Sequence, residues 1–345
     1  MDLQQLVRPN VLALKPYSSA RSEYTGDAEV FLDANENPFD TGLNRYPDPL
    51  QWEVKKKLGK LKGVAPENIF LGNGSDEVID LLVRIFCNPG ADRIVILPPT
   101  YGMYRVCADI CGVEVAEIPL TPQFQPDVAT ILADVDEHSK LLFLCSPNNP
   151  TGNVFEPARI EALLQGFPGI VVVDEAYIDF AAGKGCLALL EDYDNLVVMQ
   201  TFSKAWGLAG IRLGMAFAGR AIIDLMNKVK PPYNVNQLTQ EAVLRALDNQ
   251  PQQQQWVTSL LGQRVLLQQF LSGLDFVTRI YPSDANFLLV KVKDPKALYL
   301  YLVNQKIIVR DRSNVLLCEG CLRITVGAPE ENERLAQALV EYDNG

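Results

Sequence analysis

Short apolar runs alternate with stretches of helical periodicity along the first two thirds of the chain. The runs have the length and the β-branched content of buried strands, and most of them end in polar or glycine-rich residues. They cover residues 69–71, 94–97, 141–145, 170–173 and 196–199. Stretches between them, such as 158–164, have the pattern of helices. Strands that alternate with helices predict an α/β fold with a mainly parallel sheet.

The pattern changes after residue 230. We expect helices over 236–248 and 256–272, separated by the polar tract Gln252–Gln255. Shorter apolar runs farther on predict strands, over 286–292, 307–310 and 322–326. This mixture predicts a smaller α+β domain. A chain of 345 residues is long enough for one large domain and a smaller one.

The first 30 residues carry little periodicity and contain two prolines and a glycine, which predicts an arm rather than part of a core. We therefore expect three parts. They are an N-terminal arm over 1–30 that packs with the small domain, a large domain over 31–250 and a small C-terminal domain over 251–345. Within the large domain, residues 31–38 are expected to form a short strand that ends in turn formers.

A lysine, Lys204, stands where the buried strand 196–199 ends, in a turn that leads into a glycine-punctuated segment. Burying an ammonium is costly unless the charge is paired or neutralised. A Schiff base with an aldehyde removes the charge, and pyridoxal phosphate (PLP) is the commonest such aldehyde in enzymes. Ser203 and Arg212 then supply a hydroxyl and a guanidinium suited to the cofactor's phosphate. The alternative is a solvated lysine in an ordinary turn.

Other polar residues also follow predicted strands, namely Tyr101, Asn149, Asp174 and Tyr177. Ligands of such sheets bind beyond the carboxyl ends of the strands, where these side chains should meet Lys204. Asp174 is suited to pair with the protonated pyridine nitrogen of PLP. Asn149 and Tyr177 can hydrogen-bond the 3-oxygen of the ring, and Tyr101 offers an aromatic face for stacking. Taken singly, Asp174 could instead cap a helix, and Asn149 could belong to an ordinary turn.

Residues 69–77 have the pattern of a strand, a glycine turn and a helix start, with Ser75 as the expected N-cap. Such a helix start offers free N–H groups and the positive end of the helix dipole to a phosphate. We expect backbone contacts from Ser75 and Asp76 to the cofactor phosphate. The pattern G-x-G-x-x-E lacks the third glycine of a dinucleotide fingerprint, which disfavours a nicotinamide cofactor. Asp76 and Glu77 are also ordinary first-turn acids.

A formal net charge of −11, with no basic block to offset it, argues against nucleic acid as a partner. An anionic substrate would need a local group of arginines, and Arg310, Arg312 and Arg323 lie close together in the sequence. No apolar run approaches the roughly 18 residues that a membrane helix needs. The N-terminus lacks the basic start and apolar core of a signal peptide. We therefore expect a cytoplasmic protein without a membrane partner.

Cysteine and histidine usage bears on metal binding and on proton transfer. Seven cysteines are an odd number without framework spacing, so we expect reduced thiols. Cys318 and Cys321 form one C-x-x-C, but no second pair or histidine is nearby, and no metal site is expected. The single histidine, His138, lies in a polar stretch and is expected at the surface. Lys204 is then the available group for proton transfer.

Four motifs occur in a fixed order: G-N-G-S-D-E at 72–77, N-N-P-T-G at 148–152, D-E-A-Y at 174–177 and S-K-x-x-G-L-A-G-x-R at 203–212. Together they resemble the motifs of the fold-type I, class I and II aminotransferases. N-E-N-P at 35–38 followed by N-R-Y-P-D-P at 44–49 narrows the resemblance to the histidinol-phosphate aminotransferase family. The resemblance covers nearly the whole chain.

This resemblance implies PLP as the cofactor, bound by the turn lysine, and a homodimer with shared active sites. In such a dimer Tyr46 would reach the cofactor phosphate of the neighbouring subunit. Histidinol phosphate and 2-oxoglutarate would be the substrates, with imidazole acetol phosphate and glutamate as products. Tyr17 and Asn35 would lie at the substrate. Arg323 would bind the phosphate in one half-reaction and a carboxylate in the other, assisted by Arg310.

Two other functions remain open at this point, and a third is disfavoured. A decarboxylase that acts on a phosphorylated amino acid such as phosphothreonine would share the fold, the lysine and the arginines. An aromatic amino acid aminotransferase is also similar. A PLP-sensing transcription regulator carries the same domain, but it needs a DNA-binding domain in front, for which the arm of this acidic chain leaves no room.

Overall fold

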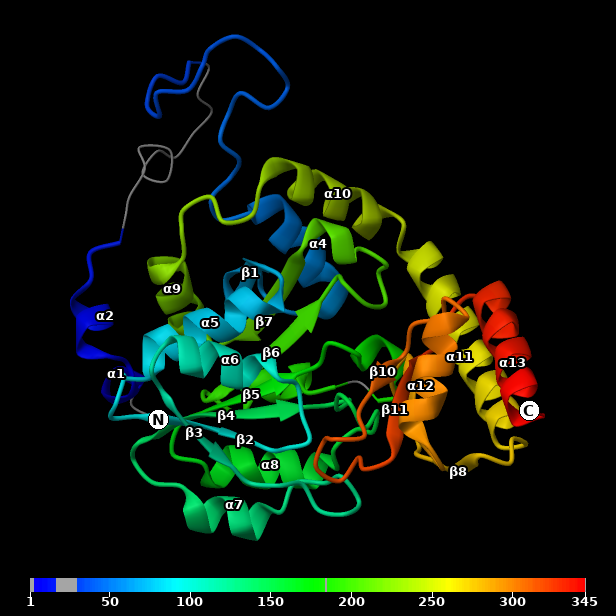
Figure 1. The fold of residues 1–345 in the computed structure, drawn as a ribbon. Helices are drawn as coiled ribbons and strands as arrows, with labels where there is room; N and C mark the ends of the chain where they lie inside the picture. Colours follow the sequence, from blue (N-terminus) through cyan, green and yellow to red (C-terminus); the bar gives the residue numbers. More distant parts are fainter. Residues whose placement is uncertain (1–2, 17–29, 184, 345) are drawn as a thin grey trace.

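A seven-stranded sheet forms the centre of the molecule (Figure 1). The computed structural model describes residues 3–16, 30–183 and 185–344. The strands are β1 (Ile69–Asn73), β2 (Arg93–Ile96), β3 (Glu114–Glu117), β4 (Ser139–Cys145), β5 (Ile170–Asp174), β6 (Leu196–Thr201) and β7 (Leu213–Ala218). Their order is β1-β7-β6-β5-β4-β2-β3, with β7 antiparallel to β1 and β6 and the other pairs parallel. The predicted α/β fold with a mainly parallel sheet is confirmed.

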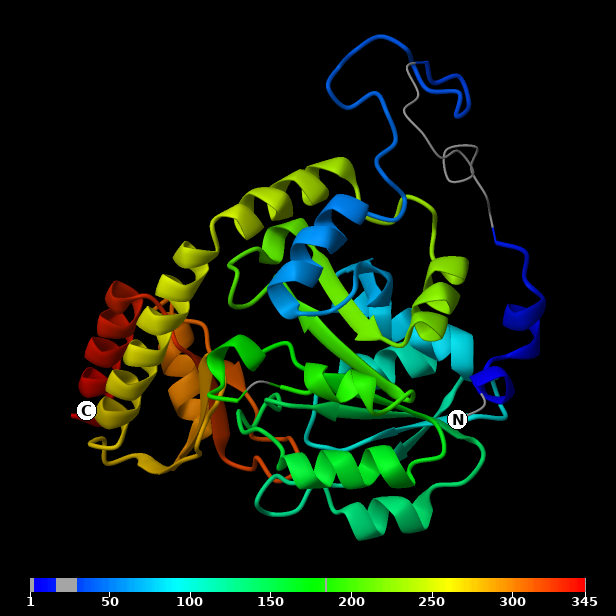
Figure 2. The same cartoon turned by 180° about the vertical axis from the view of Figure 1, so that it is seen from behind.

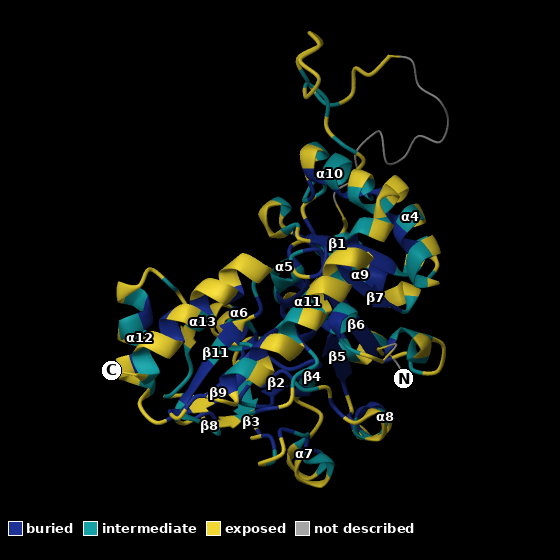
Figure 3. Ribbon diagram, turned by 90° about the vertical axis from the view of Figure 1, so that its right-hand side faces the viewer, coloured by how far each residue is buried: buried dark blue, intermediate teal, exposed yellow. Residues whose placement is uncertain are grey.

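Helices cover both faces of this sheet. They are α4 (Trp52–Lys62), α5 (Ser75–Phe86), α6 (Met103–Ile110), α7 (Val128–Asp134), α8 (Pro157–Gly166), α9 (Arg220–Val229) and α10 (Gln237–Asp248). Successive side chains of a strand point to opposite faces. On β4, Leu142 and Leu144 pack with α4, α7, α8 and α10, whereas Leu141 and Phe143 pack with α5, α6 and α9. Both faces are therefore covered, and Figure 3 shows these strands buried between helices whose outer sides are exposed.

A second, antiparallel sheet lies to one side of the first (Figure 2). Its strands are β8 (Val277–Ile280), β9 (Phe287–Val292), β10 (Arg310–Asp311) and β11 (Cys321–Thr325), in the order β10-β11-β9-β8. It shares a core with α11 (Gln250–Leu271), α12 (Pro295–Asn304) and α13 (Pro329–Asp343). This part has the α+β character expected from the sequence. The boundary at residue 250 stays a prediction.

Three local predictions are wrong. Residues 31–38 form no strand and are mostly exposed, because no neighbouring strand pairs with them among the described residues. The tract Gln252–Gln255 lies inside α11, because the helix begins at Gln250, Pro251 is favourable in its first turn and glutamine is a good helix former. The N-cap of α5 is Gly74, and Ser75 is the first helical residue.

The first helices, α1 (Leu3–Leu6) and α2 (Pro9–Ala13), pack on the large sheet's layer of α5 and α9 rather than on the small domain as predicted. Val7 and Val11 are buried there, and the backbone N–H of Arg8 donates to the Ile85 carbonyl at 3.0 Å. Leu3 and Leu6 pack against the same layer and are partly buried. The prediction is therefore wrong for residues 3–13, while residues 17–29 lie outside the described part.

Residues 30–46 project from the rest of the chain in both Figure 1 and Figure 2. Large apolar side chains are exposed along this projecting segment, including Leu32 at 88% and Phe39 at 78%. Within the described residues, no helix has the length and apolarity needed to cross a membrane.

Candidate active site

Most of the predicted site residues line one cavity of about 810 Å³. They are Ser75, Asp76, Tyr101, Asn149, Asp174, Tyr177, Ser203, Lys204, Arg212, Arg310 and Arg323. The cavity lies where β4, β5 and β6 end and where β10 and β11 of the second sheet face them. Parallel strands end at the same edge of a sheet, so the residues that follow them are brought together there.

Lys204 lies in the turn that connects the antiparallel strands β6 and β7. Its Nζ atom lies 5.5 Å from the centre of the Tyr177 ring. Partial burial lowers the pKa of Lys204, and the positive charge of Arg323 lowers it further, while Asp174 acts in the opposite direction. An amine with a lowered pKa is more available as a nucleophile and a base near neutral pH.

Asp174 is the last residue of β5 and is only 3% exposed. The Tyr104 hydroxyl donates to its Oδ2 at 2.6 Å, and the Ala176 N–H donates to its Oδ1 at 3.1 Å. Burial raises the pKa of Asp174, and the hydrogen bond from Tyr104 opposes this. In the described part of the chain, no ion pair includes Asp174. The buried carboxylate thus borders the cavity, and no cation of the described residues forms an ion pair with it.

The first turn of α5 forms a cup with Arg212. Arg212 Nη2 lies 3.3 Å from Asp76 Oδ2, and the Arg212 carbonyl accepts from the Gly74 N–H at 2.8 Å. Arg212 has a φ of 53°, a left-handed conformation that is costly for a residue with a side chain. A Cβ on Gly74 would lie 2.8 Å from Arg212 Nη2, and one on Gly214 would lie 2.1 Å from the Ser75 nitrogen. Gly74 also has a φ of +79°, so the cup favours glycine at position 74 for its backbone conformation and requires it at position 214 for space.

Three arginines of the second sheet line the opposite wall of the cavity. Arg310 and Arg323 are partners across β10 and β11, and Arg312 follows β10. Arg323 Nη1 donates to Asn149 Oδ1, and its guanidinium lies 5.2 Å from the centre of the Phe287 ring. Burial lowers the pKa of Arg323, and it lowers that of Arg312 together with the neighbouring arginines. This wall favours an anionic ligand.

Two buried donors of this wall are unused. The Nε atoms of Arg312 and Arg323 have no hydrogen-bond partner within the described residues. A buried donor without an acceptor costs free energy, so a ligand that supplies an acceptor gains affinity here.

Two predicted site residues do not line the cavity. Tyr46 lies on the projecting segment, is 50% exposed and stacks on Tyr233 with ring centres 4.4 Å apart and an interplanar angle of 12°. Asn35 is exposed on the same segment. Tyr17 lies outside the described residues.

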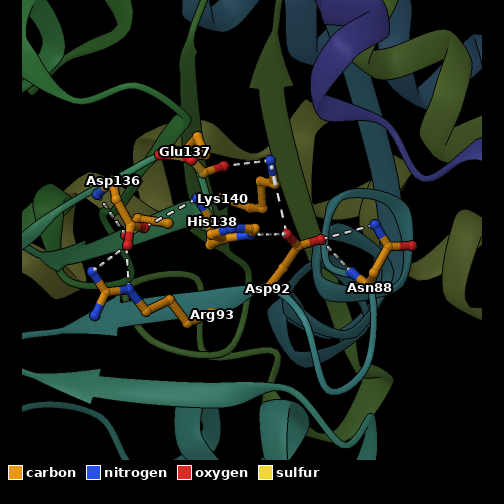
Figure 4. Close-up of polar contacts among 8 residues, drawn as sticks. Asn88, Asp92, Arg93, Asp136, Glu137, His138 and Lys140 are labelled. Atoms are coloured by element: carbon orange, nitrogen blue, oxygen red, sulfur yellow. Dashed lines mark hydrogen bonds and ion pairs between the residues drawn. The ribbon is translucent and has the colours of Figure 1, made fainter.

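His138 and its neighbours lie at the amino ends of β2 and β4, away from the cavity (Figure 4). Its side chain is 55% exposed, and its Nδ1 lies 3.6 Å from Asp92 Oδ1. Lys140 Nζ lies 3.8 Å from the same oxygen and donates to the Glu137 carbonyl at 2.5 Å. Asn88 donates to the other Asp92 oxygen through its backbone and its side chain. The predicted surface position of His138 is confirmed.

Comparison with known proteins identifies the family. The family described as aminotransferase class I and II matches residues 21–339. Over 345 residues the chain is 55% identical to the histidinol-phosphate aminotransferase of Cytophaga hutchinsonii, with 99% of each chain covered. The chain belongs to the histidinol-phosphate aminotransferases of this family.

Solved structures of histidinol-phosphate aminotransferases have the same fold. The enzyme from Clostridium acetobutylicum superposes with a TM-score of 0.81 at 22% identity, over 88% of this chain and 92% of that one. The enzyme from Sinorhizobium meliloti, solved in complex with pyridoxal-5'-phosphate, gives a TM-score of 0.79 at 25% identity, over 87% and 83%. The predicted fold type I and the predicted family are confirmed.

Two residues of this aminotransferase's site were missed as site residues in the sequence analysis. Arg312 was grouped with Arg310 and Arg323 but given no role. Side chains two positions apart in an extended chain point to the same side, so the role expected for Arg310 also suggested one for Arg312. Tyr104 was not considered. It lies in the first turn of α6, three residues after Tyr101, and a buried tyrosine needs a partner for its hydroxyl.

Proposed function

We propose that this chain is a PLP-dependent histidinol-phosphate aminotransferase of histidine biosynthesis. It would move the amino group of L-histidinol phosphate to 2-oxoglutarate, giving imidazole acetol phosphate and glutamate. The observation that carries the proposal is the position of Lys204 in a cavity between the buried carboxylate of Asp174 and a wall of arginines. The 55% identity with a relative named for this activity supports the choice of substrate.

The donor set of the cavity fits PLP. Asp174, buried and without a cationic partner in the described chain, would pair with the protonated ring nitrogen. Asn149 and Tyr177 would hydrogen-bond the 3-oxygen, and Tyr101 would lie against the ring. The cup at the start of α5 would hold the phosphate through backbone N–H groups. Ser203 and Arg212, which also line the cavity, would add a hydroxyl and a guanidinium.

Bound PLP supplies an electron sink that makes the amine-bearing carbon of the substrate acidic. The Nζ atom of Lys204 would take the proton from that carbon, and its lowered pKa supports this role. Tyr104 would fix the Asp174 carboxylate through its 2.6 Å hydrogen bond. Asp174 would then hold the ring nitrogen in its protonated form.

The arginine wall would bind the substrate anions. Arg323 would hold the phosphate of histidinol phosphate in one half-reaction and a carboxylate of 2-oxoglutarate in the other, with Arg310 assisting. Guanidinium groups match both anions in a two-point geometry. Arg312, whose Nε is buried and unpaired within the described residues, would contribute a third cation at the phosphate.

A homodimer with shared active sites is also part of the proposal. The projecting segment exposes apolar side chains such as Leu32 and Phe39, which a second copy of the chain would cover. Tyr46 of this segment would reach the cofactor phosphate of the partner subunit. Mixing Tyr46→Ala subunits with Lys204→Ala subunits should then regenerate some complete sites and recover activity. A monomer that is fully active at low concentration would contradict shared sites.

One assay tests the function itself. The purified protein with PLP is given 2-oxoglutarate and one amine from a panel: histidinol phosphate, phosphothreonine, tyrosine or phenylalanine. Glutamate and carbon dioxide are then measured. We expect glutamate formation to be fastest with histidinol phosphate. Carbon dioxide release from phosphothreonine would identify a decarboxylase, and faster turnover of tyrosine or phenylalanine would identify an aromatic aminotransferase. The cytoplasmic location stays a prediction.

A further inference from the structure

A buried lysine lies outside the cavity, near the base of the projecting segment. Lys230 directly follows α9, is only 6% exposed, and its ammonium donates three hydrogen bonds to backbone carbonyls. The acceptors are Pro49 at 2.8 Å, Pro231 at 3.1 Å and Pro232 at 2.7 Å. An ammonium has three donors, so these carbonyls use all of them. Burial lowers the pKa of Lys230 to about 8, which indicates that keeping the charge at this position has a cost in free energy.

The three carbonyls belong to two segments that meet at Tyr46. Pro49 lies three residues after Tyr46, at the base of the projecting segment. Pro231 and Pro232 directly precede Tyr233, whose ring stacks on Tyr46 at 4.4 Å. Lys230 thus connects the two segments that carry the stacked rings, the one with Tyr46 and the one with Tyr233. Without its ammonium the described structure would keep the Gln51 amide as a donor to the Pro49 carbonyl at 2.8 Å, the Gln240 amide as a donor to the Asp48 carbonyl at 3.3 Å, and the stack itself.

The same short segment also contacts the cup at the start of α5. Asn234 Nδ2 donates to the Leu71 carbonyl of β1 and to Glu77 Oε2 of α5, each at 3.0 Å. Glu77 Oε2 in turn accepts from the Asn73 N–H. Residues 230–234 therefore connect the base of the projecting segment with the helix start that lines the cavity.

We propose that Lys230 is a positioning residue that sets the placement of the Tyr46 ring, and through it the binding of the cofactor phosphate in the dimer. This inference rests on the proposed function, in which Tyr46 reaches the cofactor of the partner subunit. Its basis is the set of three carbonyl contacts together with the Tyr46–Tyr233 stack. Removing the ammonium breaks the link between Pro49 and residues 231–232, so the Tyr46 ring is held less firmly.

The test is a double-mutant cycle on the full-length protein, with Lys230→Met, Tyr46→Phe and the double variant. For each protein the dissociation constant of PLP is measured by absorbance titration, and the melting temperature is measured in parallel. We expect Lys230→Met to weaken PLP binding about tenfold, which corresponds to about 1.4 kcal/mol. In the Tyr46→Phe background the same substitution should weaken it less than about twofold, because the group that it positions is already lost.

Lys140→Met serves as the matched control. Lys140 is also a largely buried lysine, with a side chain that is 14% exposed, but it lies in the cluster of Figure 4 at the other end of the sheet. This variant should lower the melting temperature and leave the dissociation constant of PLP unchanged. If Lys230→Met does not fold, Lys230→Gln, whose amide keeps two donors, replaces it in the cycle.

Two outcomes would overturn the inference alone: unchanged PLP affinity in Lys230→Met while Tyr46→Phe weakens it, or the same loss from Lys230→Met in both backgrounds. The second outcome would show a general structural effect. If Tyr46→Phe itself leaves PLP affinity unchanged, then Tyr46 does not contact the phosphate. That result overturns the role of Lys230 and the shared-site part of the proposed function together, whereas the amine assay tests the reaction independently.

Discussion

Replacing Arg323 with alanine is the most direct test of the proposed anion site. The side chain is held by its hydrogen bond to Asn149 and by the Phe287 ring at 5.2 Å, and its Nε is buried without a partner in the described chain. The backbone of β11 is paired on both sides, with β9 and β10, so the strand should keep its register. We therefore expect a folded protein that lacks the anion site.

The size of the loss follows from the number of hydrogen bonds. A lost hydrogen bond to a charged group costs about 1.5–3 kcal/mol, and a guanidinium makes two with a phosphate or a carboxylate. The expected total of about 3–6 kcal/mol lowers kcat/KM by roughly 10²- to 10⁴-fold. Both half-reactions should be affected, because both substrates would use Arg323. Arg310 is more exposed, and water can partly replace it.

Arg310→Ala is thus the comparison variant. It should lose at least about tenfold in kcat/KM with histidinol phosphate, the low end for one charged hydrogen bond. It should lose much less with an amine donor that carries no phosphate. Single-turnover measurements with each substrate separate the two half-reactions. The reasoning is refuted if Arg323→Ala affects only one half-reaction or loses less than about tenfold, since surface ion pairs are worth only about 0–1 kcal/mol.

Three further predictions concern buried or reactive groups. Lys204→Ala should abolish transamination, and borohydride treatment of the wild-type protein should attach the cofactor to Lys204, as peptide mapping would reveal; attachment elsewhere would reject the assignment. Asp174→Asn keeps the side-chain volume but loses the charge opposite the ring nitrogen, so kcat should fall by about 10²- to 10³-fold, and a near-normal rate would count against that role. Burial raises the pKa of Glu175 to about 7 from 4.5, with the Cys186 N–H and the Gln200 amide as its donors. Because the folded-state pKa lies above the unfolded value, the wild type should lose stability as the pH rises from 4.5 to 7, by up to about 3 kcal/mol relative to Glu175→Gln. Unfolding of both proteins at pH 5 and pH 8 measures this difference, and a pH-independent difference would contradict it.

The sequence allowed good predictions where local pattern decides the outcome. Asp174 and Lys204 each follow a continuous apolar run, and such runs are strands in which both faces are buried. The carboxyl ends of parallel strands share one edge, so the pattern also predicted that these residues meet. The ordered motifs from residues 35–38 to 203–212 then sufficed for the family.

Other features depend on contacts between residues that are distant in sequence, and the local sequence pattern does not reveal these contacts. Tyr46 and Asn35 lie outside the cavity within one chain, because their segment projects from it. The hydrogen bond from Tyr104 to Asp174 joins residues 70 positions apart. Residues 3–13 pack on the large domain through Val7 and Val11, which contact an apolar layer of residues distant in sequence. Tertiary contacts of this kind need the folded chain before they can be recognised.

The close approach of Gly214 to the start of α5 has a consequence for how tolerant the site is to change elsewhere. A Cβ on Gly214 would lie 2.1 Å from the Ser75 nitrogen, so β7 and the start of α5 are in main-chain contact at this residue. The spacing between the cup and the Lys204 turn, which β7 follows, is therefore limited by a direct main-chain contact at Gly214. Substitutions in the apolar layers can loosen side-chain packing and lower the melting temperature while this spacing stays constant. Substitutions of core residues would therefore leave the spacing between the cup and the Lys204 turn unchanged.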